Sequence, residues 1–321
     1  MKTRLALTLL GIALLAVPAS YGQATSGIVG FSNVTVAPGG AVIVPSLVNS
    51  SVFQGEATIS GTTITPTTAP GWTSGSFNAT AFTTISQIPN YPTHYVEIIS
   101  GTNEGLILDI STNSTTSLTT SQVGPSGTFQ VAIREHVTLS KVTQGATGLT
   151  EFDDVATLFE TVFSPTTQTN RVNRVYVGAP NVWETDTGKP AGHTVIYPGT
   201  GFAFTATGTV VFAMMGEVKP TKTQIPLYST SPNIVAPLNP ATNNLLSASG
   251  LAATLEDFDD TITTFSTNGL MSALPYIANG GLIERDNGSP VSASDYIALN
   301  RGVAIGVLTP KTWIVNSPLN P

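Results

Sequence analysis

Acidic side chains recur at matched spacing in two parts of the sequence, and they offer the most specific chemistry of the chain. A Phe-Asp-Asp segment occurs at 152–154 and at 258–260, and a Glu-x-Asp-x-Gly-x-Pro segment follows each copy, at 184–190 and at 284–290. Calcium prefers carboxylate and other hard oxygen ligands on loops, so calcium is the one cofactor that these segments suggest. The candidate calcium ligands are Asp153, Asp154, Asp259 and Asp260.

Two aspartates of the repeated turns, Asp186 and Asp286, are candidate carbohydrate-binding residues together with Trp72 and Trp183. Paired carboxylates hydrolyse glycosides, and aromatic rings offer flat apolar faces to a sugar. A structural role is the simpler interpretation of all these acids. Aspartates complement the dipole at a helix start and hydrogen-bond the backbone in tight turns.

The usual catalytic motifs are missing. The three histidines, His94, His136 and His193, do not stand in any zinc-binding spacing. The sequence also lacks a Gly-x-Ser-x-Gly nucleophile elbow and a phosphate-binding loop with its Lys-Ser/Thr. We therefore assign no catalytic residue, and the sequence favours a protein without enzymatic activity.

The N-terminus has the regions of a secretory signal peptide. Lys2 and Arg4 precede an apolar run over 5–17, and small residues follow up to Ala24. Cleavage there predicts a leader at 1–24 and export to the periplasm, the cell surface or the extracellular medium. No later segment is long and apolar enough for a transmembrane helix. The sequence has no Cys, which excludes a lipoprotein anchor and a disulfide framework.

The mature chain is acidic and sparsely charged. Loss of the leader leaves ten basic and 19 acidic residues, a net charge of −9, which argues against nucleic acid as a partner. Charged residues make up 10% of the sequence, against a usual ~25%. Between Leu5 and Ile133 there is no Lys or Arg. A surface that depends on Thr, Ser and Asn is typical of exported β-proteins and envelope components.

Short Val-, Ile- and Thr-rich runs between turn residues predict an N-terminal β domain over 25–133, either a sandwich or a small barrel. Two units follow, at 134–218 and at 219–321, and their matched segments indicate a duplication. Apolar residues at intervals of three and four predict a helix near 151–163 and another near 251–265, each followed by strands. The predicted fold is mainly β with two short helices.

Three segments, His-Tyr-Val-Glu-Ile-Ile-Ser-Gly at 94–101, Glu-Gly-Leu-Ile-Leu at 104–108 and Ser-Thr-Asn at 111–113, carry a family likeness. Gly-Glu-Val at 216–218 and Asn-Ile-Val at 233–235 add to it. With these segments the chain resembles a family of uncharacterised exported bacterial proteins known mainly from verrucomicrobial-type genomes. The resemblance covers most of the mature chain and implies secretion and the domain layout above. The family carries no assigned activity, so it supplies no catalytic residues.

These features favour a secreted or cell-envelope protein of structural or adhesion type, which self-assembles or contacts an envelope glycan. The alternative is a carbohydrate-binding module or glycosidase that uses the repeated carboxylates and exposed Trp side chains. A solvent-facing cleft with two acids and a Trp would favour the alternative. Acids scattered over a convex surface would favour the structural protein.

Overall fold

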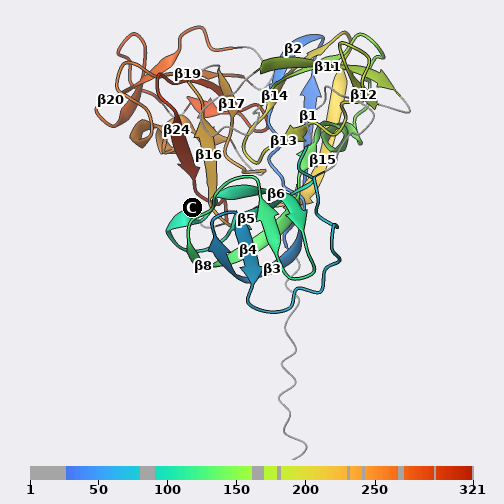
Figure 1. Ribbon diagram of the computed structural model, residues 1–321. Coiled ribbons are helices and arrows are strands. Elements are labelled where there is room, and N and C mark those ends of the chain that lie inside the picture. The colour runs from blue at the N-terminus through green and yellow to red at the C-terminus, as the bar shows by residue number, and fades with distance from the viewer. Residues whose placement is uncertain are drawn as a thin grey trace, which may run out of the picture.

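The computed structural model describes residues 27–79, 91–160, 170–178, 182–229, 232–240, 243–266, 271–292 and 294–319. The predicted leader lies outside these ranges. The fold is mainly β, as the sequence predicts, and consists of a barrel below two lobes (Figure 1). Within the described ranges, no helix is long and apolar enough to cross a membrane.

The barrel comprises β3 (Ser51–Ser60), β4 (Thr63–Pro66), β5 (His94–Ile98), the short turn η1 (Gly101–Asn103), β6 (Ile107–Asn113), β7 (Leu118–Thr120) and β8 (Gly127–Glu135). Its strands close in the order β3-β4-β7-β6-β5-β8. Along β3, Ala57 and Ile59 are buried while Thr58 and Ser60 are exposed, because alternate side chains of a barrel strand face inward and outward. Of the two predicted β architectures, the structure is the barrel.

The first lobe comprises β1 (Val29–Val36), β2 (Gly39–Ile43), β9 (Val137–Thr138), helix α2 (Leu139–Thr143), β10 (Val155–Glu160), β11 (Asn170–Gly178), β12 (Val182–Thr185), β13 (Val195–Ile196), β14 (Phe202–Ala206) and β15 (Val210–Glu217). Its main sheet has the order β12-β11-β10-β14-β2, and β1 pairs with β15 in a separate ribbon. The sequence places β1 and β2 in the N-terminal domain, but they pair with strands far later in the chain. Apolar side chains from both groups of strands form one core.

The second lobe comprises β16 (Thr223–Leu227), β17 (Asn233–Val235), β18 (Asn244–Leu245), the 3-10 turns η2 (Leu246–Ala248) and η3 (Leu251–Ala253), β19 (Thr261–Thr264), β20 (Tyr276–Asn279), β21 (Leu282–Arg285), β22 (Tyr296–Ile297), β23 (Val303–Gly306) and β24 (Lys311–Val315). Its main sheet has the order β17-β23-β19-β20-β21, and β16 pairs with β24. Taken in chain order, each main-sheet strand has a counterpart at the same sheet position in the first lobe.

The two predicted helices are wrong. Residues 251–265 form η3, a turn and strand β19, and the described part of 151–163 forms a turn followed by β10. The backbone φ angle is 66° at Phe152 and 63° at Phe258, and this left-handed conformation cannot continue a right-handed helix. The β-branched run of β19 also favours a strand. The intervals of three and four therefore arise from a turn followed by a strand.

The two lobes meet through matched backbone contacts. The Val44 N–H donates to the Asn300 carbonyl at 3.0 Å, and the Ala236 N–H donates to the Gly199 carbonyl at 2.9 Å. In each case the residue just beyond a sheet-edge strand of one lobe contacts a turn of the other. These hydrogen bonds satisfy backbone groups that the sheets leave unpaired.

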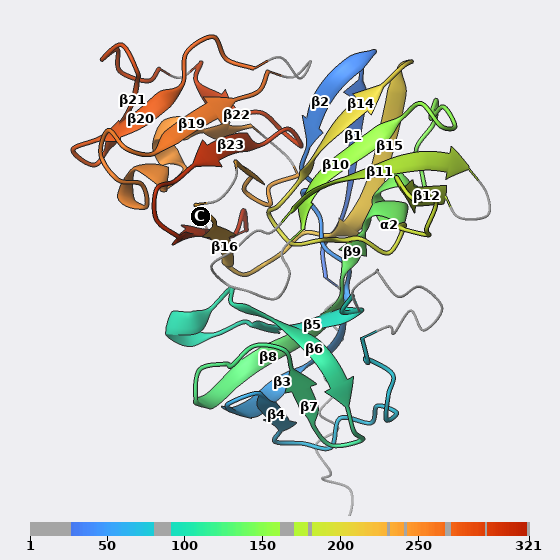
Figure 2. The same ribbon diagram turned by 45° about the horizontal axis from the view of Figure 1, so that its top comes forward.

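The barrel is inserted into the first lobe. The chain leaves that lobe after β2, forms the whole barrel below both lobes and returns at β9 (Figure 2). Asn49 Nδ2 donates to the carbonyls of Glu135 and His136, both at 3.1 Å, and so joins segments that lie 86 and 87 positions apart. In the described part of the second lobe, no such domain is inserted, and β18 is the next strand after β17.

Candidate functional site

The two Phe-Asp-Asp segments each contain one buried and one exposed aspartate. Asp154 is fully buried, and its carboxylate accepts hydrogen bonds from the N–H groups of Thr150 at 2.8 Å and Thr207 at 3.0 Å. Asp153 is exposed. A buried carboxylate that fixes the backbone of a turn serves folding, because it satisfies donors that would otherwise be unpaired.

The second segment repeats this arrangement. Asp260 is fully buried and accepts hydrogen bonds from the N–H groups of Glu256 at 2.8 Å and Leu308 at 3.0 Å, while Asp259 is exposed. Lys311 Nζ also lies 2.7 Å from an Asp260 carboxylate oxygen. Among the residues that the structure describes, no three His, Asp or Glu side chains are grouped closely enough to hold a metal ion. The calcium site remains a prediction, without an assembled set of ligands.

The Glu-x-Asp-x-Gly-x-Pro segments form hairpin turns at the ends of β12 and β21. Asp186 and Asp286 are exposed in these turns, and the glycine two residues later has a positive φ angle of 75° at Gly188 and 78° at Gly288. Figure 2 places β12 and β21 on opposite outer sides of the molecule. The two carboxylates therefore do not face each other across a common cleft, as glycoside hydrolysis requires.

The two candidate Trp side chains pack inside the fold. Trp183 is fully buried, and its indole N–H donates to the Thr143 hydroxyl at 2.9 Å. Trp72 is partly buried between Phe53 and Phe77, with ring centroids 5.2 and 5.4 Å away. Both rings contribute to packing, and the face of Trp183 is not accessible to a sugar.

An open pocket of about 370 Å³ lies in the second lobe beside β19, β20 and β22. Its carboxylate, Asp295, accepts a hydrogen bond from the Tyr276 hydroxyl at 2.7 Å and forms an ion pair with Arg285. Burial would raise the pKa of Asp295, but hydrogen bonds from Ser292 and Tyr276 and the charge of Arg285 lower it. The pocket holds a single, already paired acid and no Trp, so it lacks the two carboxylates of a glycosidase.

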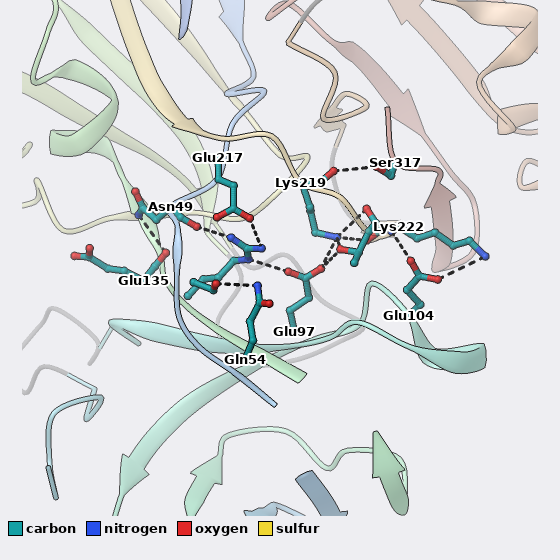
Figure 3. A network of polar contacts seen from close by, with 12 residues as sticks. Asn49, Gln54, Glu97, Glu104, Glu135, Glu217, Lys219, Lys222 and Ser317 are labelled. Carbon is teal, nitrogen blue, oxygen red and sulfur yellow. Dashed lines mark hydrogen bonds and ion pairs between the residues drawn. The ribbon is translucent and has the colours of Figure 1, made fainter. Parts of the chain in front are cut away.

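Four buried charges meet where the barrel joins the lobes (Figure 3). Glu97 lies on β5, Arg134 on β8, Glu217 at the end of β15, and Lys219 two residues further on. Arg134 Nε donates to Glu97 Oε2 at 3.1 Å, and an Arg134 terminal nitrogen donates to Glu217 Oε1 at 2.9 Å. Lys219 Nζ lies 2.7 Å from Glu97 Oε1. We call these four residues the junction cluster.

The junction cluster is nearly inaccessible to water and balanced in charge. The side chains of Glu97, Arg134 and Lys219 are 0%, 1% and 1% exposed. The remaining Arg134 terminal nitrogen donates to the Asn49 carbonyl at 2.8 Å. Because desolvation of each ion costs several kcal/mol, such a cluster persists only when every charge has a close partner. The cluster joins the barrel to the segment that connects the two lobes.

The pKa values of the two cations of the junction cluster are shifted in opposite directions. Burial lowers the pKa of Lys219, and the charge of Glu97 offsets this only in part. Burial also acts to lower the pKa of Arg134, but the hydrogen bond to Glu217 and the charge of Glu97 outweigh it and raise that pKa. Of the two cations, Lys219 therefore loses its proton more easily than Arg134.

A second buried polar group ties the barrel to the first lobe. Asp109 on β6 lies 3.0 Å from His136 Nε2 through one carboxylate oxygen and accepts a hydrogen bond from the Tyr197 hydroxyl at 2.7 Å through the other. Gln122 Nε2 adds a third bond at 3.1 Å. Burial would raise the pKa of Asp109, but the hydrogen bonds from His136, Tyr197 and Gln122 outweigh it and lower that pKa.

The sequence patterns do not identify the junction cluster or the buried group around Asp109, although the scarcity of charged residues before position 134 points to some of their members. Arg134 is the first basic residue after Arg4, and Glu97 and Asp109 are two of only four acids between them. Charged side chains are rarely fully buried unless they are paired. A few isolated charges in a long uncharged stretch are therefore candidates for a buried network, but their partners beyond position 190 cannot be identified from spacing.

Comparison with protein-family models, with curated proteins and with solved structures gives no match. The function is therefore inferred from the geometry of the residues described above. Membership of the exported bacterial family remains a prediction.

Proposed function

We propose that the chain is an exported structural or adhesion protein of the cell envelope or extracellular space, without enzymatic activity. The observation that supports this function best is the position of the junction cluster. Its charges are buried between the barrel and the lobes and bonded to one another, whereas catalytic acids and bases must reach a substrate. Export and membership of the exported bacterial family are part of the proposal and rest on the leader and on the sequence resemblance.

The outer face of the barrel also supports a role in surface contact. Thr58 on β3 lies opposite Thr65 on β4 and Thr128 on β8, and Thr63 on β4 lies opposite Thr119 on β7. All five side chains are exposed. A face of uncharged hydroxyl groups can hydrogen-bond a glycan or a second copy of the chain without the free-energy cost of removing water from a charged group.

We also infer that the two lobes derive from one duplicated all-β unit. The matched strand order of their main sheets supports this inference. The buried carboxylates of Asp154 and Asp260 each accept a hydrogen bond from the N–H group four residues earlier. Phe152 and Phe258 have the same left-handed backbone conformation, which is rare for a bulky residue. The proposed unit contains strands where the sequence suggests helices.

Light scattering and negative-stain microscopy of the purified protein, with and without millimolar calcium, test the proposed function. Large ordered assemblies are the expected result. If assembly requires calcium, we would assign the exposed Asp153 and Asp259 as calcium ligands. Replacement of both residues by Asn should then abolish assembly. A calcium-indifferent monomer that binds cell-wall polysaccharide would favour the carbohydrate-binding alternative. A monomer that binds neither copies nor glycans would contradict the proposal.

A further inference from the structure

We propose that Lys219 and Glu97 condense to an intramolecular amide, which covalently joins the barrel to the segment between the two lobes. The proposal starts from the placement of the two groups. Lys219 Nζ lies 2.7 Å from Glu97 Oε1, and both side chains are almost completely excluded from solvent. An amine and a carboxyl group in contact are the two reactants of an amide, and the exclusion of bulk water opposes the reverse hydrolysis.

The surroundings activate both reactants. Arg134 Nε donates to Glu97 Oε2 at 3.1 Å, so a fixed cation faces the oxygen on which negative charge develops when an amine attacks the carboxyl carbon. Glu217 holds the same guanidinium in place at 2.9 Å. Burial lowers the pKa of Lys219 although the charge and hydrogen bond of Glu97 act to raise it, so Nζ gives up a proton more easily than a lysine in water. Arg134 acts as the electrostatic group, and Glu217 is a positioning residue.

The reaction balances within the cluster. Lys219 Nζ transfers one proton to Glu97 Oε1, and its lone pair then forms a bond to the Glu97 carboxyl carbon while charge collects on Oε2. A second proton moves from Nζ to Oε1, the bond between carbon and Oε1 breaks, and one water molecule leaves. The third proton remains on the amide nitrogen. Neither an oxidant nor a reductant is needed.

Electrostatics favours the product. Before condensation the cluster contains two cations and two anions that are almost fully desolvated, at a cost of several kcal/mol for each ion. Condensation removes one charge of each sign and leaves Arg134 paired with Glu217. The remaining pair is still balanced, so the reaction relieves desolvation without creating an unpaired buried charge.

Three other lysines that lie beside carboxylates, Lys141, Lys222 and Lys311, lack these features. The side chains of Lys141 and Lys222 are 46% and 47% exposed, so bulk water reaches both amines. Lys311 lies beside Asp260 and Glu256. Burial acts to lower the pKa of Lys311, but the hydrogen bonds that it donates to these two carboxylates outweigh burial and raise that pKa. Lys311 therefore holds its proton more firmly than Lys219, whose pKa is lowered.

A covalent bond at this position suits a chain without Cys. It would close a ring that contains the end of the barrel and most of the first lobe, because Glu97 is in β5 and Lys219 follows β15. Such a ring restricts the unfolded chain as a disulfide does. The inference goes beyond the proposed function, since an enzyme or a glycan-binding protein could equally contain the bond.

The mass of the denatured, purified full chain tests the proposal directly. The expected mass is one water molecule below that calculated for the observed N-terminus. Fragmentation should then yield a branched peptide that joins Glu97 to Lys219. Pro220 follows Lys219, and trypsin spares a Lys–Pro bond in either form, so the branched peptide, produced with chymotrypsin, is the diagnostic product.

Two variants complete the test. Lys219→Met should restore the full calculated mass, whereas Lys222→Met, a matched control at the exposed neighbouring pair, should keep the loss of one water. A wild-type chain of full mass would overturn the proposal even if Lys219→Met fails to fold. A loss of water that persists in Lys219→Met would overturn it as well, because the bond would then lie elsewhere. These readouts are independent of assembly and glycan binding.

Discussion

Replacement of Arg134 by Met should strongly destabilise the protein. The substitution removes the hydrogen bonds to Glu97, Glu217 and the Asn49 carbonyl and leaves Glu217 without the cation that lies 2.9 Å away. Removal of one partner from a buried ion pair costs about 3–5 kcal/mol. At roughly 2 °C per kcal/mol for a chain of this size, the melting temperature should fall by about 6–10 °C.

Urea denaturation followed by far-ultraviolet circular dichroism measures this loss, and two further variants establish its cause. Arg134→Met combined with Glu217→Gln removes both charges and should recover part of the loss, because replacing a buried pair together costs less than breaking it. Lys222→Met acts on a pair that is 47% and 24% exposed and should change the free energy of unfolding by less than about 1 kcal/mol. An Arg134→Met variant that loses no more than Lys222→Met would refute the assigned role of the junction cluster.

Three further predictions concern the repeated turns and one partly buried histidine. Asp154→Ala leaves the N–H groups of Thr150 and Thr207 without their acceptor, so it should lower the free energy of unfolding, measured by urea denaturation, by about 2–4 kcal/mol. Asp153→Ala, at the exposed neighbour, should leave that free energy within about 0.5 kcal/mol of wild type. Equal losses in the two variants would contradict the structural role of Asp154. Phe258→Gly should raise stability by about 1 kcal/mol because Gly relieves the left-handed strain at φ 63°, and a gain that Phe258→Ala shares would disprove this cause, since Ala keeps the strained Cβ. Burial, aided by the charge of Arg174, lowers the pKa of His193 from 6.5 to about 4. The unfolded chain therefore binds this proton at higher pH than the folded one, and stability should fall as the pH drops from 6.5 towards 4. Thermal melts of His193→Gln should show a weaker dependence over that range, and an unchanged dependence would assign the effect to other groups.

The sequence predicts the β class, a sandwich or small barrel in the N-terminal part, and the recurrence of matched segments, because these depend on local composition and turn residues. Short Thr- and Ile-rich runs on either side of Ser60-Gly61 become the paired strands β3 and β4. The failed helix prediction shows the limit of periodicity. Leu251, Leu255, Phe258 and Ile262 stand at intervals that suit a helix, but the left-handed backbone at Phe258 and the β-branched residues after it belong to a turn and a strand.

Contacts between distant segments could not be predicted from one sequence. The pairing of β1 with β15 and the meeting of Glu97 with Lys219 depend on the insertion of the barrel, which no local pattern encodes. For the same reason, a single sequence suggests site residues only by residue type and recurrence, and it does not show which of them are buried. Trp183 is an aromatic residue in a turn-rich segment, but its burial depends on the packing of the whole first lobe.

The inserted barrel also determines the order in which the protein can fold. β1 and β2 cannot pair until β14 and β15 have been synthesised, whereas the barrel is complete at Glu135. Closing a long loop costs entropy and slows folding. A barrel that folds first brings Asn49 beside His136 and so holds the ends of β2 and β9 together before the rest of the first lobe exists. We therefore expect the barrel to fold before the first lobe, because a folded barrel shortens the loop that must close when β1 and β2 pair with β15 and β14.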